Sequence, residues 1–359
     1  MALLWMDGFD HYGSGSTGRD NMTNYGAYAA VDSGLSISNV RARTGTYSLR
    51  GYGGSDQYAR RVFGAQKSAV GFGCAVYMDA IPSNVYNVTL CDFWDVNGYT
   101  LCRIRVKSDG SLQLWRGSSS SGSEVSSTSG PVMTAGGWYH FECKFTPNGA
   151  TSSIEVRVNE VTVLNNGSFA IGTALSGDGT TSTETSSVRF GNHLVAAYVY
   201  VDDLFAWDTS GSYNTDFIGD RKVATLMPNG DTSVMDWTPD TGSTEYTQID
   251  EIGPDGDTSY VYVGAVSNAE AEFDLEAMPS NAGAIAAVQT YVAARKTDAG
   301  TCDYRTDIVS GGLDTAGDSH PITTSYLYYM DVFETDPNTG AQWTKSGVDS
   351  AKIRLVREA

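Results

Sequence analysis

The chain has 359 residues, a formal charge of −19 and a hydrophobic fraction of 41%. A chain this acidic lacks the basic patches that nucleic-acid backbones and anionic lipid surfaces require, so both classes of partner are disfavoured. With 40 glycines and 21 tyrosines but only 9 prolines, the composition favours many strands with tight turns around a substantial core.

The N-terminal run MALLWMDGFDHYG has no basic segment, and its apolar stretch is too short for a secretory signal peptide. No stretch approaches the ~20 apolar residues that span a membrane. The five cysteines form no C-x-x-C pair and no Cys/His cluster at metal-ligand spacing. We therefore expect folding in a reducing cytoplasm with free thiols, no membrane insertion, and no metal or cofactor.

Strand patterns follow one another through the first 210 residues, and turn residues separate them. Asn97-Gly98, Asp109-Gly110 and Asn148-Gly149 are pairs that tolerate the positive φ of hairpin turns. No long amphipathic helix is expected in this half. The predicted strands cover 46–52, 68–79, 87–95, 99–117 (a hairpin), 138–147, 152–166 (a hairpin), 187–192 and 197–208.

The segment 138–166 carries a recognisable pattern. Trp138, His140 and Glu142 alternate with apolar residues, a Pro-Asn-Gly turn follows, and a second alternating strand leads to Asn159-Glu160. This pattern resembles the hairpin of concanavalin A-like, laminin-G-type jelly rolls. Glu160 stands where that family usually has glycine, so we expect a looser turn there.

Two further stretches extend this resemblance over about residues 1–210. The segment 188–208, VRFGNHLVAAYVYVDDLFAWD, is similar to the closing strands of the jelly roll. DGFDHYG (7–13) would then be the N-terminal partner strand beside it. The resemblance implies a jelly-roll sandwich over residues 1–210, followed by a linker over 211–220.

Residues 221–359 are predicted to form an acidic second β-sandwich domain, which makes the fold class all-β with two sandwich domains. Residues 219–359 hold 9 Lys+Arg and 23 Asp+Glu, a net charge of −14, whereas residues 1–218 hold 14 and 19, a net of −5. The alternation of Val288, Thr290 and Val292 favours a strand over an alanine-rich helix. The predicted strands cover 222–231, 258–266, 271–278, 286–296, 304–312, 325–340 and 352–358.

Several segments of this half, GDRKVATLMPNGD, AVQTYVAARKTDAGTCDYR and YYMDVFETDPNTGAQWTKSGVDSAKIRLV, together resemble a domain frequent in structural proteins of tailed bacteriophages. There it follows a laminin-G-like domain. The resemblance implies a non-enzymatic virion protein on the particle surface: a capsid decoration or head fibre, or a tail component. Its partners would be other virion proteins, copies of itself in a symmetric homo-oligomer such as a trimer, and host surface glycans. Such a protein is made in the host cytoplasm and released by lysis.

The run AEFDLEAM (271–278) suggests a different function. Glu272, Asp274 and Glu276 alternate with Phe273 and Leu275, so on a strand the three carboxylates share one face. Laminarinase-type glycoside hydrolases use this spacing, and a retaining glycosidase needs two carboxyls ~5–5.5 Å apart. An exposed strand of an acidic domain shows the same alternation of acidic and apolar residues. The run also lies outside residues 1–210, the part that resembles the laminarinase-like fold. We favour this structural interpretation and predict no catalytic residues; a glycoside hydrolase and a free glycan-binding lectin remain the alternatives.

We interpret the other candidate sites as structural features. Asp202-Asp203, within the predicted strand 197–208, and the loops 176–181 and 253–259 suggest Ca²⁺ ligands, but none has the full EF-hand spacing; because Asp-Gly is foremost a turn former, we interpret the two loops as turns. The four histidines are scattered, and no nucleophile elbow or phosphate-binding loop occurs. Trp138, Phe141, Tyr198 and Tyr200 are predicted to lie in the strand core or to pack on the sheet. Segments 24–31 and 52–61 are the better candidates for exposed aromatic contacts.

Overall fold

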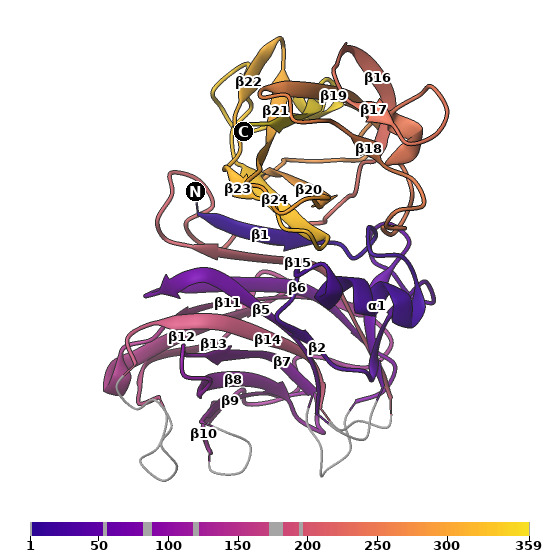
Figure 1. Cartoon of the computed structure of the whole chain (residues 1–359). Helices are drawn as coiled ribbons and strands as arrows, with labels where there is room; N and C mark the ends of the chain where they lie inside the picture. The colour runs from indigo at the N-terminus through magenta and orange to yellow at the C-terminus, as the bar shows by residue number, and fades with distance from the viewer. Residues whose placement is uncertain are drawn as a thin grey trace.

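The computed structural model describes residues 2–52, 56–81, 88–117, 122–171, 182–193 and 197–358. Figure 1 shows a large sandwich of curved sheets with a smaller body of strands stacked on one of its faces. We call them the first sandwich (β1 to β15) and the C-terminal unit (β16 to β25). The predicted all-β fold class, with a jelly-roll sandwich as its first part, is confirmed.

The first sandwich consists of an eight-stranded and a seven-stranded sheet packed face to face around one apolar core. The eight-stranded sheet contains β13 (Val161–Phe169), β12 (Ser152–Val158), β11 (Trp138–Thr146), β6 (Val70–Met78), β15 (Tyr198–Asp208), β4 (Ser48–Tyr52) and β3 (Leu35–Ser38), with β1 (Leu3–Asp7) paired to β15. The seven-stranded sheet contains β10 (Ser123–Ser127), β9 (Leu112–Arg116), β8 (Thr100–Val106), β7 (Val88–Trp94), β14 (Thr185–His193), β5 (Asp56–Lys67) and β2 (Ala30–Val31).

The N-terminal partner of β15 lies earlier in the chain than predicted. Residues 3–7 pair with β15, whereas DGFDHYG forms the turn that follows. Phe9 takes a φ of 63°, and its N–H donates to Asp7 Oδ1 at 2.8 Å, so the strand ends at Asp7. The helix α1 (Gly15–Asn24) and the strands β5 and β10 were not predicted.

The turn between β12 and β13 is tight, and the expectation of a looser turn was wrong. Asn159 and Glu160 take φ values of 47° and 66°, so two residues connect the strands. The Asn159 N–H donates to the His140 carbonyl at 2.8 Å, and Asn159 Oδ1 accepts from the His140 N–H at 3.0 Å. Glu160 therefore occupies a left-handed conformation that glycine adopts more readily.

The C-terminal unit is built on a six-stranded sheet. This sheet contains β16 (Pro228–Met235), β19 (Ala269–Leu275), β25 (Lys352–Arg357), β21 (Asp303–Ser310) and β22 (Leu313–Thr315), with β23 (His320–Pro321) paired to β21. A second layer holds only the antiparallel pair β20 (Val288–Ala294) and β24 (Leu327–Phe333). The remaining elements are the short pair β17 (Thr238–Pro239) and β18 (Val261–Tyr262), the helix α2 (Lys345–Asp349), and two 3₁₀ turns at Gly149–Thr151 and Tyr246–Gln248.

Two predicted strands of this unit differ from the structure. The strand expected over 222–231 begins at Pro228, and only Val261 and Tyr262 of 258–266 are paired as a strand. The strand predicted over 286–296 is confirmed as β20, because its register with β24 runs unbroken from Val288 to Ala294. The expected boundaries at 210 and 220 fall in the segment between β15, which ends at Asp208, and β16.

The connecting segment crosses the outer face of the eight-stranded sheet and is fastened there by buried carboxylates. Glu142 accepts hydrogen bonds from the N–H groups of Ile218 and Gly219 at 2.8 and 3.1 Å. Gly71 on β6 leaves room for Trp207, whose ring atoms would lie 1.9 Å from an added Cβ. Aromatic side chains can therefore lie flat on this face, and the C-terminal unit covers part of it.

Candidate functional site

A row of aromatic rings lies on the outer face of the eight-stranded sheet, away from the connecting segment. It comprises Tyr52, Tyr77, Trp138, Tyr198 and Tyr200, and we call it the aromatic platform. On β15, Val199 and Val201 point into the core. Because successive side chains of a strand alternate, Tyr198 and Tyr200 point outward.

Strand pairing places the rings of the aromatic platform next to one another. Tyr52 is paired with Tyr198, Tyr200 with Tyr77, and Tyr77 with Trp138. The ring centroids are 4.6 Å apart for Tyr52–Tyr198, 6.0 Å for Tyr77–Tyr200 and 5.6 Å for Tyr77–Trp138. Tyr198 and Tyr200 join the two parts of the row at 6.2 Å. Four adjacent strands thus contribute to one continuous aromatic surface.

The platform is most open to solvent at its Tyr52–Tyr198 end. Tyr52 is 51% exposed and Tyr198 is 36% exposed, while Trp138 and Tyr77 are half-buried. Tyr200 is only 1% exposed and supports the rings around it. Tyrosine and tryptophan rings exposed together in this way are typical of binding surfaces.

Two arginines border the platform. The Arg41 guanidinium lies 4.5 Å from the Tyr77 ring centroid and donates from Nε to Asp79 Oδ1 at 3.2 Å. The Arg50 guanidinium lies 5.0 Å from the Tyr198 ring centroid and donates from Nε to Ser36 Oγ at 3.3 Å. Burial, with a smaller contribution from Asp79, raises the pKa of Tyr200. The platform therefore combines flat apolar ring faces with fixed N–H donors and neutral phenol groups.

The four aromatic residues predicted to lie in the core or on the sheet divide between these two settings. Phe141 and Tyr200 are buried. Trp138 and Tyr198 lie on the outer face, where they pack against Tyr77 and Tyr52 of neighbouring strands. Both faces of the central strands carry apolar residues, and alternation alone does not tell which face is covered.

The two segments predicted to make exposed aromatic contacts have divided roles. From segment 52–61, Tyr52 belongs to the platform, while residues 53–55 lie outside the described chain. From segment 24–31, Tyr28 is 2% exposed, and its hydroxyl donates to Asp7 Oδ2 at 2.7 Å. Tyr25 packs against Tyr328 of the C-terminal unit, with ring centroids 5.1 Å apart. This second segment therefore joins the two parts of the molecule.

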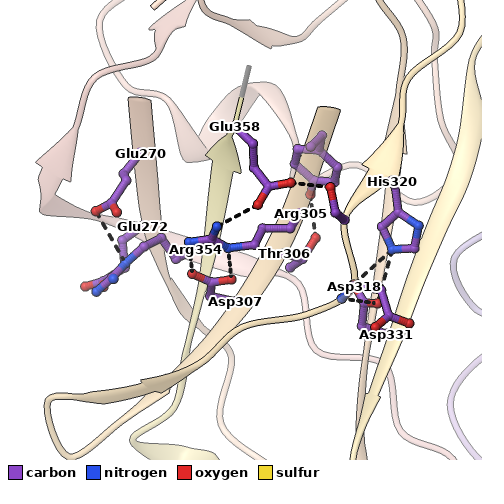
Figure 2. Close-up of polar contacts among 12 residues, drawn as sticks. Glu270, Glu272, Arg305, Thr306, Asp307, Asp318, His320, Asp331, Arg354 and Glu358 are labelled. Carbon is purple, nitrogen blue, oxygen red and sulfur yellow. Dashed lines mark hydrogen bonds and ion pairs between the residues drawn. The ribbon is translucent and has the colours of Figure 1, made fainter. Parts of the chain in front are cut away.

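Glu272 of the acidic run 272–276 belongs to a group of ion pairs on β19, β25 and β21, which we call the charge ladder. It contains Glu270 and Glu272 with Arg354, and Arg305 with Asp307 (Figure 2). On β19 the side chains alternate as predicted, since Phe273 is fully buried and Asp274 is exposed. Glu272 Oε2 accepts from Arg354 Nε and Nη2 on β25 at 3.2 and 2.8 Å, and Lys352 Nζ lies 3.3 Å from Glu272 Oε1.

These cations determine the ionisation of Glu272. Burial favours its neutral form, but the hydrogen bonds from Arg354 and Lys352 outweigh that effect and hold its pKa below the usual range. Glu276 lies beyond the end of β19, where its carboxylate accepts from the Met227 N–H at 3.2 Å. A general acid needs a raised pKa, so the geometry favours the structural interpretation of this run.

The remaining candidates also have structural partners. Asp202 Oδ2 accepts from the Arg43 and Thr44 N–H groups at 2.7 and 3.2 Å, and Asp203 Oδ1 accepts from the Val223 N–H at 2.8 Å. In the loop 253–259, the Asp255 carboxylate accepts hydrogen bonds from the N–H and hydroxyl groups of Ser259. The loop 176–181 lies outside the described residues. No cluster of three or more His, Cys, Asp or Glu side chains suited to a metal occurs in the described ranges, and no helix there is long and apolar enough to cross a membrane.

Comparison with known proteins gives a likeness to parts of several solved structures. No family model and no curated protein matches this chain. A Trypanosoma rangeli sialidase is 14% identical over 57% of this chain and 30% of its own, with a TM-score of 0.36. A carbohydrate-binding module from Bacillus subtilis is 12% identical over 45% of this chain and 86% of its own (TM-score 0.30), and a Caenorhabditis elegans galectin is 10% identical over 44% and 94% (TM-score 0.27). The chain thus spans less than a third of the sialidase's length. A sandwich fold hosts many functions, so these likenesses do not assign one to this chain.

Proposed function

We propose that this protein binds glycans through the aromatic platform. The observation that supports this proposal is the continuous row of rings across four strands, exposed at Tyr52 and Tyr198 and flanked by Arg41 and Arg50. Sugar rings have a face of C–H groups that packs on an aromatic ring, and hydroxyl groups at their edge that accept hydrogen bonds. The platform offers groups complementary to both.

The arginines make the surface better suited to oxygen-rich ligands than to apolar peptide. Arg41 has Asp79 as its ion-pair partner, whereas no carboxylate pairs with Arg50 in the described part of the chain. Guanidinium N–H groups without a counter-ion favour hydroxyl or carboxylate oxygens of a ligand. Uronic or other acidic sugars are therefore the preferred class.

We further propose that the protein acts on the surface of a tailed-phage particle as a non-enzymatic structural component. The sequence resemblance of both halves to virion proteins supports this setting. In it, the first sandwich would contact host glycans while the C-terminal unit would attach to the capsid or tail, in a symmetric homo-oligomer. A hydrolytic role for Glu272 is disfavoured because its carboxylate is held by Arg354 and Lys352.

Glycan binding is tested with immobilised bacterial surface polysaccharides and two platform variants, Trp138→Ala and Tyr198→Ala. We expect each to weaken binding about tenfold, which corresponds to about 1.4 kcal/mol for a central aromatic contact. Tyr99→Ala is the matched control, because Tyr99 is 38% exposed on the same sandwich but outside the platform. Equal affinities for all three variants and the parent would refute the proposal.

The particle setting is tested by immunogold electron microscopy of purified particles. Label on the capsid or tail is the expected result. Unlabelled intact particles beside a strong signal in the soluble lysate would contradict it. In the same preparation, release of reducing ends from polysaccharide that disappears in Glu272→Gln would restore the glycosidase hypothesis.

A further inference from the structure

The C-terminal unit contains a cavity of about 1370 Å³. Its floor is apolar and comes from the six-stranded sheet, through Phe273, Tyr304, Ile308 and Leu355, and its opposite side includes Met6 and His11 of the first sandwich. Sites for small molecules usually measure ~300–1,000 Å³. This cavity has room for a larger occupant.

The walls of the cavity are extended backbone. Every residue of 220–228, 259–265 and 284–298 contributes to the lining. Side chains of an extended chain point alternately to its two faces. When consecutive residues all line one cavity, it is therefore the backbone edge of the chain that faces the cavity. β20 lies within the third stretch, and in the described ranges it pairs with β24 alone. Its other edge therefore offers unpaired N–H and C=O groups to the cavity.

Polar side-chain atoms in the lining also have no partner. Within the described chain, Arg221 Nε, Glu251 Oε2 and Thr290 Oγ1 are buried without a hydrogen bond, and Thr290 is only 5% exposed. Buried polar atoms are paired in most folded proteins because an unmade hydrogen bond costs about 1–3 kcal/mol. Three such atoms around one cavity are available to hydrogen-bond with an occupant.

The charge of this unit narrows the choice of occupant. Residues 219–359 carry 9 basic and 23 acidic side chains, so the same unit of a second copy would be repelled. The lining holds both signs of charge, but its Asp240, Glu251 and Asp255 have no basic side chain as ion-pair partner in the described residues. The net charge of the unit and these three carboxylates both attract a basic segment.

We propose that the cavity receives an extended segment of a different protein, which adds a strand to the free edge of β20. Alternate residues of that segment would be apolar and pack on the six-stranded sheet, and lysine or arginine at its ends would pair with Asp240, Glu251 and Asp255. Strand addition uses backbone hydrogen bonds for affinity and side-chain pockets for specificity. This inference deepens the proposed attachment of the C-terminal unit and rests on it for the natural partner.

The test uses the full chain and a synthetic peptide, KVTVTVTVK, with EVTVTVTVE as its acidic counterpart. Hydrogen exchange of the backbone amides of 288–294 is the readout, because a strand added to β20 protects them. Gly264 lines the cavity, and an added Cβ there meets no atom within 4 Å, so Gly264→Trp places a bulky side chain at the lining with no clash at its Cβ. Gly130→Trp is the matched control, since Gly130 is equally unobstructed but lies on the first sandwich.

We expect the basic peptide to slow exchange of β20 amides at least tenfold at saturation, and the acidic peptide to bind at least tenfold more weakly at low salt. Gly264→Trp should abolish this protection, and Gly130→Trp should retain it. Three results would overturn the inference: no protection, equal binding of both peptides, or protection that appears without peptide as the chain self-associates. Glycan binding by Gly264→Trp is measured in parallel and should be unchanged, so failure of the platform proposal is distinguishable from failure here.

Discussion

The buried carboxylate of Asp7 connects the first sandwich to the C-terminal unit, and Asp7→Asn is the most informative change in this structure. Asp7 is 1% exposed, and its Oδ2 accepts from the hydroxyls of Tyr12 and Tyr28 at 2.7 Å each. Arg61 Nη1 lies 3.5 Å from the same oxygen, and Arg61 is 4% exposed. Tyr12 in turn contacts the Tyr291 hydroxyl of β20 at 3.0 Å.

The expected cost follows from the charge that remains. Asp7 is the only carboxylate within ion-pair distance of Arg61 in the described chain, so Asp7→Asn leaves a buried cation without a counter-ion. Breaking a buried pair in this way costs about 3–5 kcal/mol. Tyr291→Phe keeps the Asp7–Arg61 ion pair and removes the hydroxyl that contacts Tyr12 and Arg61, for about 1 kcal/mol per hydrogen bond.

Urea unfolding monitored by tryptophan fluorescence measures both variants. The Arg61 guanidinium lies 4.6 Å from the Trp5 ring centroid, so Trp5 reports on the region of the change. We expect Asp7→Asn to lower the free energy of unfolding by at least about 2 kcal/mol more than Tyr291→Phe does. Equal effects of the two variants would refute the assignment of a buried ion pair.

Three further predictions test other parts of the structure. Gly110→Ala should lower the free energy of unfolding by at least about 2 kcal/mol, because Gly110 has a φ of +79° and an added Cβ would lie 2.1 Å from the Met133 carbonyl oxygen. Gly98→Ala should cost about half as much, because its Cβ meets nothing closer than 3.8 Å. A larger loss for Gly98→Ala than for Gly110→Ala would contradict the turn geometry. The hydrogen bond to Asp331, 3.1 Å from His320 Nε2, raises the pKa of His320 despite its partial burial. The stability that this pair contributes is therefore complete below pH 6.5 and is lost as pH rises through the raised pKa. His320→Gln should flatten the profile of unfolding free energy against pH by under ~1 kcal/mol, and a profile identical to that of the parent would contradict this assignment. Native thiol titration should detect Cys302 alone, because Cys74, Cys91, Cys102 and Cys143 are fully buried and burial raises the pKa of Cys143; a second fast-reacting thiol would disprove the packing of the core.

Most strand positions and the turns between them could be predicted from the order of residues alone. Alternation over 138–147 and 152–166 indicates strands whatever they pair with, and Asp109-Gly110 marks a hairpin because glycine there relieves the positive φ. The same order predicts that Glu272 and Asp274 share a face. These features depend on the local backbone geometry of a few neighbouring residues, which the residue order specifies directly.

Which sheet faces are covered by other parts of the chain, and which residues meet across strands, depends on the tertiary structure. Trp138 and Phe141 lie on one strand, yet the first faces solvent and the second faces the core, because the opposing sheet covers one side only. Glu272 is ion-paired because β25 places Arg354 beside it from 82 residues away. Long-range pairing of this kind sets the platform, the charge ladder and the free edge of β20, and no periodicity within one strand records its neighbours.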